Sequence, residues 1–221
     1  DEDLLLFFSR RIGIGDDGSQ VPIKGGARLT GQAAGLVLGG IWMRTDPFGG
    51  APGNDYGVLR VRKNVLRGSD IGAIVMMRDA VDDESSYNRV FGADTYIRFP
   101  GEIDWSTYYV VSESPAFDDG QYAWRTSINR EGNFHHIKFG AMELGDGFTN
   151  DLGFFKRTGV RKYFLDWGVR PRPESWRRFG VREIHPHVTW NWYDDLAGDI
   201  VAKRLHSGVT FFFESGGNVQ L

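Results

Sequence analysis

Apolar and polar side chains alternate residue by residue along many segments of this chain, most clearly in residues 181–193. Successive side chains of a β-strand point to opposite faces, so such a segment has one apolar and one polar face. No segment shows a convincing helical period of three to four residues. The chain is therefore predicted to be all-β. In residues 181–193 the two alternating sets are Val188, Trp190 and Trp192 against His187, Thr189 and Asn191.

The predicted strands are long. Roughly a dozen segments of about 8–13 residues fit the pattern, whereas strands of water-soluble proteins usually have about 5–6 residues. A tilted strand needs about 9–11 residues to cross the hydrocarbon core of a bilayer. Tight turns and longer polar loops connect the segments, as in outer-membrane barrels. The predicted strands are residues 4–14, 21–33, 34–45, 58–66, 71–78, 88–99, 103–113, 121–129, 133–144, 160–170, 181–193 and 196–214.

Some parts of this pattern are less regular. Residues 4–14 and 21–33 are predicted to form a hairpin around a polar turn, and residues 196–214 form either a last pair of strands or one long bent strand. The Gly- and Asp-rich residues 145–158 are expected to hold at most one short element. Residues 171–180 are predicted to form an irregular basic loop.

The composition agrees with strands and with a membrane. Glycine accounts for 30 of the 221 residues and aromatic residues for 14 %. Glycine weakens helices, and bulky aromatic residues favour strands. The mean hydropathy of −0.35 is low for a helical membrane protein. It suits a barrel, because only alternate residues of each strand face lipid.

Charge and cysteine content exclude several classes of function. The net charge of −3 provides no basic field for nucleic acid, so no nucleic-acid partner is expected. The absence of cysteine excludes disulfides and thiolate metal sites, and it suits an outer membrane reached through an oxidising periplasm. Asp1-Glu2-Asp3 is unlike the basic start of a signal peptide, so we expect a mature or truncated chain. No cofactor is expected.

These features together predict an antiparallel transmembrane β-barrel over residues 1–221, as one domain or as a segment of a larger barrel. Aromatic residues gather near strand ends, where the girdles of membrane barrels lie. The main alternative is a soluble β-sandwich or jelly roll, in which the apolar faces of two sheets form a common core. The residues predicted to face lipid or to form girdles are Trp42, Trp105, Tyr109, Trp124, Val188, Trp190 and Trp192.

Polar residues inside these strands are predicted to face the lumen. A charged side chain on the lipid face costs about 2–4 kcal/mol at the bilayer midplane. Pairing with Asp94, Asp104 and Glu143 would form ladders of ion pairs across neighbouring strands. Such polar residues either line a lumen that is selective for anions or sugars, or they only fill the interior of the barrel as structural residues. The predicted lumen-facing residues are Arg28, Arg60, Arg62, Arg98, Arg125, Arg161, His187 and Asn191.

Two further patterns bear on chemistry. His185 and His187 share one strand face, a spacing found in some zinc sites, but Pro186 lies between them. A third ligand would have to come from His135, His136, His206 or a carboxylate, and the sequence does not show that these residues meet. We therefore predict no metal and keep these histidines as weak candidates. Neighbouring acids fall in turns that Asp favours, so they are interpreted as loop tips and not as a glycosidase pair. They are Asp16-Asp17, Asp82-Asp83-Glu84, Asp118-Asp119 and Asp194-Asp195. No nucleophile elbow occurs, and no enzymatic activity is predicted.

Ordered short motifs add a resemblance. The run LFFSRRIG is followed by VPIKGGARLTG, GLVLGGIWMRT, SDIG, NRVFGAD, GFFKRTGV and RPRP, from Leu6 to about Pro173. This series resembles a family of bacterial outer-membrane proteins of unassigned function. In that family an N-terminal carbohydrate-binding module of the family-nine type precedes a large β-barrel domain. The present chain contains nothing like that module, and further barrel strands would be missing.

The resemblance implies a location in the outer membrane of a Gram-negative bacterium, with the lipid bilayer as the principal partner. It implies a pore, a transporter or a membrane anchor linked to the binding or uptake of surface glycans. It carries over no catalytic residues. Two alternatives remain open: a soluble all-β carbohydrate-binding or glycoside-hydrolase-like protein, and a non-transporting scaffold barrel in an outer-membrane complex whose partners are other outer-membrane proteins.

Overall fold

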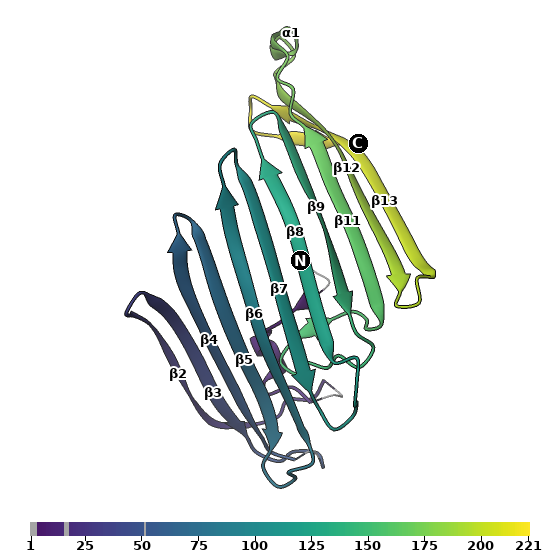
Figure 1. Ribbon diagram of the computed structural model, residues 1–221. Coiled ribbons are helices and arrows are strands. Elements are labelled where there is room, and N and C mark those ends of the chain that lie inside the picture. Colours follow the sequence, from purple (N-terminus) through teal and green to yellow (C-terminus); the bar gives the residue numbers. More distant parts are fainter. Residues whose placement is uncertain (1–3, 16–17, 51) are drawn as a thin grey trace. The chain divides into compact units, whose positions relative to one another are not determined.

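The computed structural model describes residues 4–15, 18–50 and 52–221 and shows an all-β protein. Twelve strands form one antiparallel sheet in the order β14-β13-β12-β11-β9-β8-β7-β6-β5-β4-β3-β2 (Figure 1). Strands adjacent in sequence are therefore neighbours in the sheet, apart from the interruption by β10. Among the described residues the strands at the two ends of this order do not pair, so the sheet is not closed into a barrel.

Most strands are as long as the sequence predicts. Eleven of the twelve have 10–15 residues, and the last has three. The strands are β2 (Ile23–Ala33), β3 (Leu36–Thr45), β4 (Asn54–Leu66), β5 (Ser69–Ala80), β6 (Tyr87–Phe99), β7 (Ile103–Glu113), β8 (Tyr122–Glu131), β9 (His135–Leu144), β11 (Val160–Val169), β12 (Val181–Asp195), β13 (Ile200–Phe213) and β14 (Asn218–Gln220).

The predicted opening hairpin is wrong. Residues 4–14 contain only β1 (Leu4–Leu5) and a 3-10 turn, η1 (Ser9–Arg11). β1 pairs with β10 (Phe154–Phe155), far along the chain, and not with β2. The aromatic residues that suggested a strand instead pack against distant residues. The rings of Phe8 and Phe154, for example, have centroids 6.4 Å apart. Tertiary packing therefore overrides local strand propensity here.

The other irregular segments follow the prediction more closely. Residues 145–158 hold one short element, β10, and residues 196–214 form one long strand, β13, which β14 extends by pairing with its end. Residues 171–180 contain a four-residue helix, α1 (Glu174–Arg177). In the part of the chain that is described, no helix is long and apolar enough to cross a membrane.

The turn between β2 and β3 shows how local sequence sets register. Ala34 and Gly35 both have positive φ, 51° and 76°, which is the backbone of a two-residue type I′ turn. That turn matches the twist of the strands it joins, and it places Ala33 opposite Leu36. Every pair down to Gly26 and Met43 follows from this alignment, so the turn fixes which side chains share a face.

The residues divide into two compact units. Unit 1 comprises residues 1–96, 107–124 and 144–159, and unit 2 comprises residues 97–106, 125–143 and 160–221. In unit 1, a lobe made of residues 4–15 and 144–159 attaches to one face of β5 to β7. Within the lobe, the Phe8 N–H donates to the Leu152 carbonyl at 2.7 Å, and the Thr149 N–H joins the lobe to the sheet by donating to the Ser112 hydroxyl of β7 at 3.1 Å.

The core of unit 1 lies under this lobe. The side chains of Met76, Val90 and Val110 on the sheet are almost fully buried, and so are Phe148 and Leu152 of the lobe. Burying a large apolar side chain stabilises a fold by about 1.5–3 kcal/mol. The lobe is therefore held to the sheet mainly by this cluster.

Gly92 of β6 provides a test of that packing. A Cβ at this position would lie 2.5 Å from Cγ1 of Val110 and 3.1 Å from Cγ2 of Ile74. Gly92→Ala should therefore lower the free energy of unfolding by about 1–3 kcal/mol, the usual effect of overpacking. Gly39→Ala on β3 is the matched control, because a Cβ there has no neighbour within 4 Å. Thermal unfolding followed by circular dichroism measures both, and equal unfolding temperatures would contradict the packing.

Candidate functional site

One face of unit 1 is apolar and exposed, and we call it the apolar band. Residues directly opposite each other in neighbouring antiparallel strands share a face. Two successive rows across five strands contain no polar side chain. Leu29 at one edge is 71 % exposed, and Leu59 in the third strand is 52 % exposed. The rows are Leu29, Gly40, Leu59, Val75 and Phe91, and Gly31, Leu38, Val61, Ala73 and Ala93.

The opposite face of the same strands is charged. The Arg60 guanidinium on β4 forms two hydrogen bonds with the Asp94 carboxylate on β6, spanning the strand between them. Gly72 on that middle strand makes the contact possible, because a Cβ there would lie 2.6 Å from a guanidinium nitrogen of Arg60. Arg62 lies 4.0 Å from Asp70 on the same face. Arg28 of β2 also lies on this face.

The three predicted acids do pair with arginines across strands. Besides Asp94 with Arg60, the Asp104 carboxylate accepts from Arg98 at 3.0 Å, and the Glu143 carboxylate accepts from Arg161 at 2.5 Å. The predicted partners are therefore confirmed, but as single pairs and not as ladders, and only the pairs of Asp104 and Glu143 join neighbouring strands. Surface pairs contribute about 0–1 kcal/mol each, so their main effect is to set register and charge.

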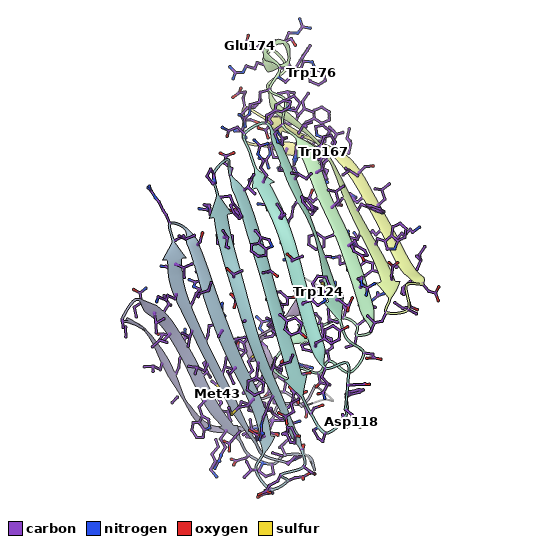
Figure 2. All side chains as sticks on the ribbon, viewed as in Figure 1. Met43, Asp118, Trp124, Trp167, Glu174 and Trp176 are labelled. Atoms are coloured by element: carbon purple, nitrogen blue, oxygen red, sulfur yellow. The ribbon has the colours of Figure 1, made fainter. Side chains whose placement is uncertain are left out.

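Unit 2 repeats the two-faced arrangement on β11, β12 and β13. Its aromatic face has rows that join Tyr163, Trp192 and Lys203; Leu165, Trp190 and Leu205; and Trp167, Val188 and Ser207. The rings of Trp190 and Trp192 meet edge to face, with centroids 5.5 Å apart. Trp167 is labelled on β11 in Figure 2. The Lys203 ammonium lies 3.8 Å from the Trp192 ring centroid, so the one charged residue in these rows makes a cation–π contact with an aromatic ring.

The remaining girdle candidates lie on β7 and β8. Trp105 donates a hydrogen bond from its indole to the Thr126 hydroxyl at 2.9 Å. Tyr109 is exposed and stacks on Tyr122, with ring centroids 6.4 Å apart. Trp124 on β8 is half-buried (Figure 2), and Trp42 of unit 1 is exposed beside the apolar band.

The polar face of unit 2 holds most of the other predicted residues. Asn191 is paired in register with Phe164 and Arg204. Arg125 bonds the Ser127 hydroxyl at 3.1 Å and lies over the Phe164 ring. Arg161 departs from the prediction: it lies on the aromatic face, in register with Asp194 at the end of β11. On this face the Glu143 carboxylate provides the polar partner that the arginine needs.

Four of the five histidines of the chain form a row on the polar face of unit 2. Ring centroids are 5.0 Å apart between His136 and His185, 5.2 Å between His185 and His187, and 5.5 Å between His187 and His206. Gly168 makes room for the first pair, since a Cβ there would lie 2.5 Å from His136 Cε1 and 2.9 Å from His185 Nε2. From the sequence, spacing joins only His185 and His187, and His136 and His206 were possible partners whose positions the spacing did not determine.

This histidine row has few internal partners. His136 Nε2 lies 3.3 Å from the Asp166 carboxylate, whereas His136 Nδ1 and His185 Nε2 are buried without a hydrogen bond among the described residues. In that same part of the chain, no group of three or more potential ligand side chains is placed to hold a metal ion. The row therefore is a set of neighbouring titratable rings and not a formed metal centre.

The histidine row should make the protein sensitive to acid. Two imidazolium ions 5 Å apart repel by about 3 kcal/mol at an effective dielectric constant of 20. An imidazole ring gains a positive charge when it is protonated in acid, so repulsion between these neighbouring rings destabilises the folded state as the pH falls. His185→Gln should reduce the drop in unfolding temperature between pH 7.5 and pH 5. His135→Gln, which alters the one histidine outside the row, should not; equal drops in both variants would contradict this account.

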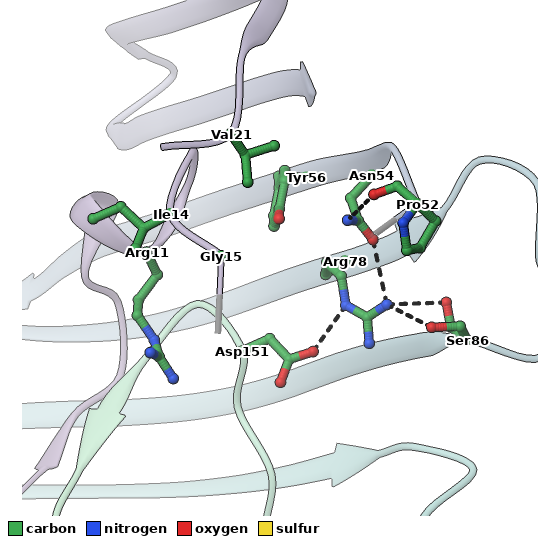
Figure 3. A pocket seen from close by; sticks show the side chains of 10 residues that line it. All are labelled: Arg11, Ile14, Gly15, Val21, Pro52, Asn54, Tyr56, Arg78, Ser86 and Asp151. Atoms are coloured by element: carbon green, nitrogen blue, oxygen red, sulfur yellow. Dashed lines mark hydrogen bonds and ion pairs between the residues drawn. The ribbon is translucent and has the colours of Figure 1, made fainter. Parts of the chain in front are cut away.

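A polar cavity lies between the lobe and the polar face of unit 1, with a volume of about 370 Å³ (Figure 3). Arg78 of β5 lines this cavity and was not anticipated from the sequence, because its partner Asp151 lies 73 residues away along the chain. Its guanidinium donates to the Asp151 carboxylate at 2.8 Å and to the Ser86 hydroxyl at 2.9 Å. Lining residues are Arg11, Ile14, Gly15, Val21, Pro52, Asn54, Tyr56, Arg78, Ser86 and Asp151.

The acidic pairs behave as turn residues where they are described. Asp195 accepts from the Asp199 backbone N–H at 2.8 Å, which closes the turn between β12 and β13. In the loop before β6, hydrogen bonds from the hydroxyl and backbone N–H of Ser85 lower the pKa of Asp83. Asp16-Asp17 lies outside the described residues. No two acids predicted as pairs line the cavity described above.

Comparison of the chain with protein-family models, with curated proteins and with solved structures gave no match.

Proposed function

We propose that this chain forms part of a β-barrel in the outer membrane of a Gram-negative bacterium, with the apolar band facing lipid. The observation that supports this most is the position of the lobe. In unit 1 the lobe covers the part of the polar face that holds Met76, Val90 and Val110 and bonds to Arg78 and Asn88 there. The apolar band on the other face has no such covering segment among the described residues and is exposed. A water-soluble protein would cover the apolar face first, because burial of apolar surface drives folding.

The length and spacing of the strands support the same proposal. Strands of 10–15 residues reach or exceed the length of about 9–11 residues that a tilted strand needs to cross a bilayer. Exposed Trp and Tyr at both units are suited to the two membrane interfaces. The polar faces, with the ion pairs of Arg60 with Asp94 and of Arg98 with Asp104, then line the lumen, where charge is tolerated. The pair of Arg161 with Glu143 is the exception, because Arg161 lies on the aromatic face near the start of β11.

The proposal requires that the open edges be paired. β2 is exposed along its whole length, and β14 covers only Thr210–Phe212 of β13. An unpaired N–H or C=O in hydrocarbon costs several kcal/mol, so a sheet in lipid must close. We propose that further strands complete the barrel between these edges.

Within this proposal the barrel is a pore, a transporter or a membrane anchor linked to glycan binding or uptake, and it carries no catalytic site. Ion pairs and the histidine row give the interior a polar surface that solutes could contact. A second candidate, a non-transporting scaffold, is favoured by the lobe, which would occupy part of the interior. Glycans and other outer-membrane proteins are the partners that these two roles imply.

Adjacent residues of β12 provide a sharp test. Trp190 lies on the aromatic face, and its neighbour in the sequence, Thr189, lies on the polar face. Trp190→Arg should block insertion into the outer membrane, since arginine on the lipid face costs about 2–4 kcal/mol at mid-depth. Thr189→Arg should insert normally.

Insertion is measured by membrane fractionation, and by a gel with and without boiling in mild detergent. A folded barrel migrates as a compact band that shifts on boiling. Equal insertion of both variants would contradict the assigned lipid face. Recovery of the wild-type protein in the aqueous fraction without a band shift would support the soluble carbohydrate-binding or hydrolase-like alternative.

A further inference from the structure

We propose that the cavity of unit 1 binds a small hydroxylated solute that carries a carboxylate, such as a sugar acid. The cavity is about 370 Å³, within the usual range of about 300–1,000 Å³ for ligand pockets. It is bounded by residues of one compact unit, so the proposal holds whether or not the sheet closes into a barrel.

Arg78 is fixed in position before any ligand arrives. Its Nε donates to Asp151, and its Nη1 donates to the Ser86 hydroxyl, to the Ser86 carbonyl at 3.2 Å and to Asn54 Oδ1 at 3.4 Å. Its side chain is only 18 % exposed. The Nη2 group has no hydrogen bond among the described residues and points away from those partners (Figure 3). A guanidinium held in this way is suited to bind an oxyanion.

Arg11 provides a second cation at the same cavity. It belongs to η1 in the lobe and is exposed, with no carboxylate partner among the described residues. In the view of Figure 3 the Arg11 guanidinium is drawn at the lower left, beside Asp151, and both residues belong to the lobe. The described lining residues thus include two arginines and one aspartate, an excess of one positive charge. This balance favours an anionic ligand.

Asp151 is held by a buried network and not by Arg78 alone. Its backbone N–H donates to Asn88 Oδ1 at 2.9 Å, and the Asn88 amide donates to the Thr149 hydroxyl at 2.9 Å. Asn88 is almost fully buried. This preorganisation reduces the entropy that binding would otherwise cost.

The rest of the lining suits a hydroxylated ring. Tyr56 provides an aromatic ring, and Asn54 and Ser86 provide polar groups that can exchange hydrogen bonds with hydroxyls. Tyr56 and Arg78 are directly paired in register on β4 and β5, so ring and guanidinium stand side by side. A ligand with a carboxylate beside a polar ring matches both groups at once.

The test uses D-galacturonate as the probe and D-galactose as its neutral counterpart, with isothermal titration of the protein in mild detergent. Galacturonate should bind at least tenfold more tightly than galactose, and added salt should weaken it. Arg11→Gln should weaken galacturonate binding about tenfold, the effect of one lost charge-assisted hydrogen bond of about 1.4 kcal/mol. Arg10→Gln is the matched control, since Arg10 is adjacent in η1 but does not line the cavity.

Asp151→Asn removes the negative charge of this residue while keeping the size and shape of its side chain. An asparagine can still accept from Arg78, but the carboxylate that competes with an anionic ligand is gone. Galacturonate binding should become tighter and galactose binding should not change. The proposal is overturned if galacturonate does not bind saturably, if galactose binds equally well, or if Arg10→Gln and Arg11→Gln have the same effect. None of these outcomes depends on membrane insertion.

Discussion

Cross-strand register is the constraint on which the two-faced structure depends. Side chains alternate between faces with a period of two, so a slip of one residue moves a whole strand's set to the opposite face. A slip of β4 would place Arg60 among the side chains of the apolar band and Leu59 against Asp94. The type I′ turn at Ala34-Gly35 and the ion pair between Arg60 and Asp94 both oppose such a slip.

The lobe packs on the polar face of the sheet, whereas the second layer of an ordinary two-layer fold packs on the apolar face. A minority of that face is apolar, at Met76, Val90 and Val110, and the lobe covers this part. Beside the apolar contact lie Arg78 and Asn88, whose partners Asp151 and Thr149 come from the lobe. The same segment therefore closes a core and leaves a polar cavity at its margin.

Much of this architecture could be predicted from the sequence, because it depends on alternation. Val188 and Trp190 share a face with each other and not with Thr189, as the period of two requires. The all-β class, the long strands and the pairing of Asp94, Asp104 and Glu143 with arginines follow from the same pattern.

Features that depend on distant contacts were not predictable in this way. The run at Leu4–Phe8 has high strand propensity but pairs with β10, about 150 residues away in the sequence. The histidine row assembles from β9, β12 and β13, and no spacing links His136 to His206. Arg161 is a different case: its assignment to the polar face was wrong, and alternation itself places it on the aromatic face with Tyr163 and Trp167.

The absence of cysteine makes the central claim directly measurable. Single cysteines placed in turn at positions 58–61 of β4 can carry a nitroxide label in protein reconstituted into lipid vesicles. The account predicts that labels at 59 and 61 are accessible to oxygen dissolved in lipid, and that labels at 58 and 60 are accessible to a water-soluble relaxation agent or buried. Water accessibility at 59 and 61 equal to that at 60 would contradict a lipid-facing apolar band.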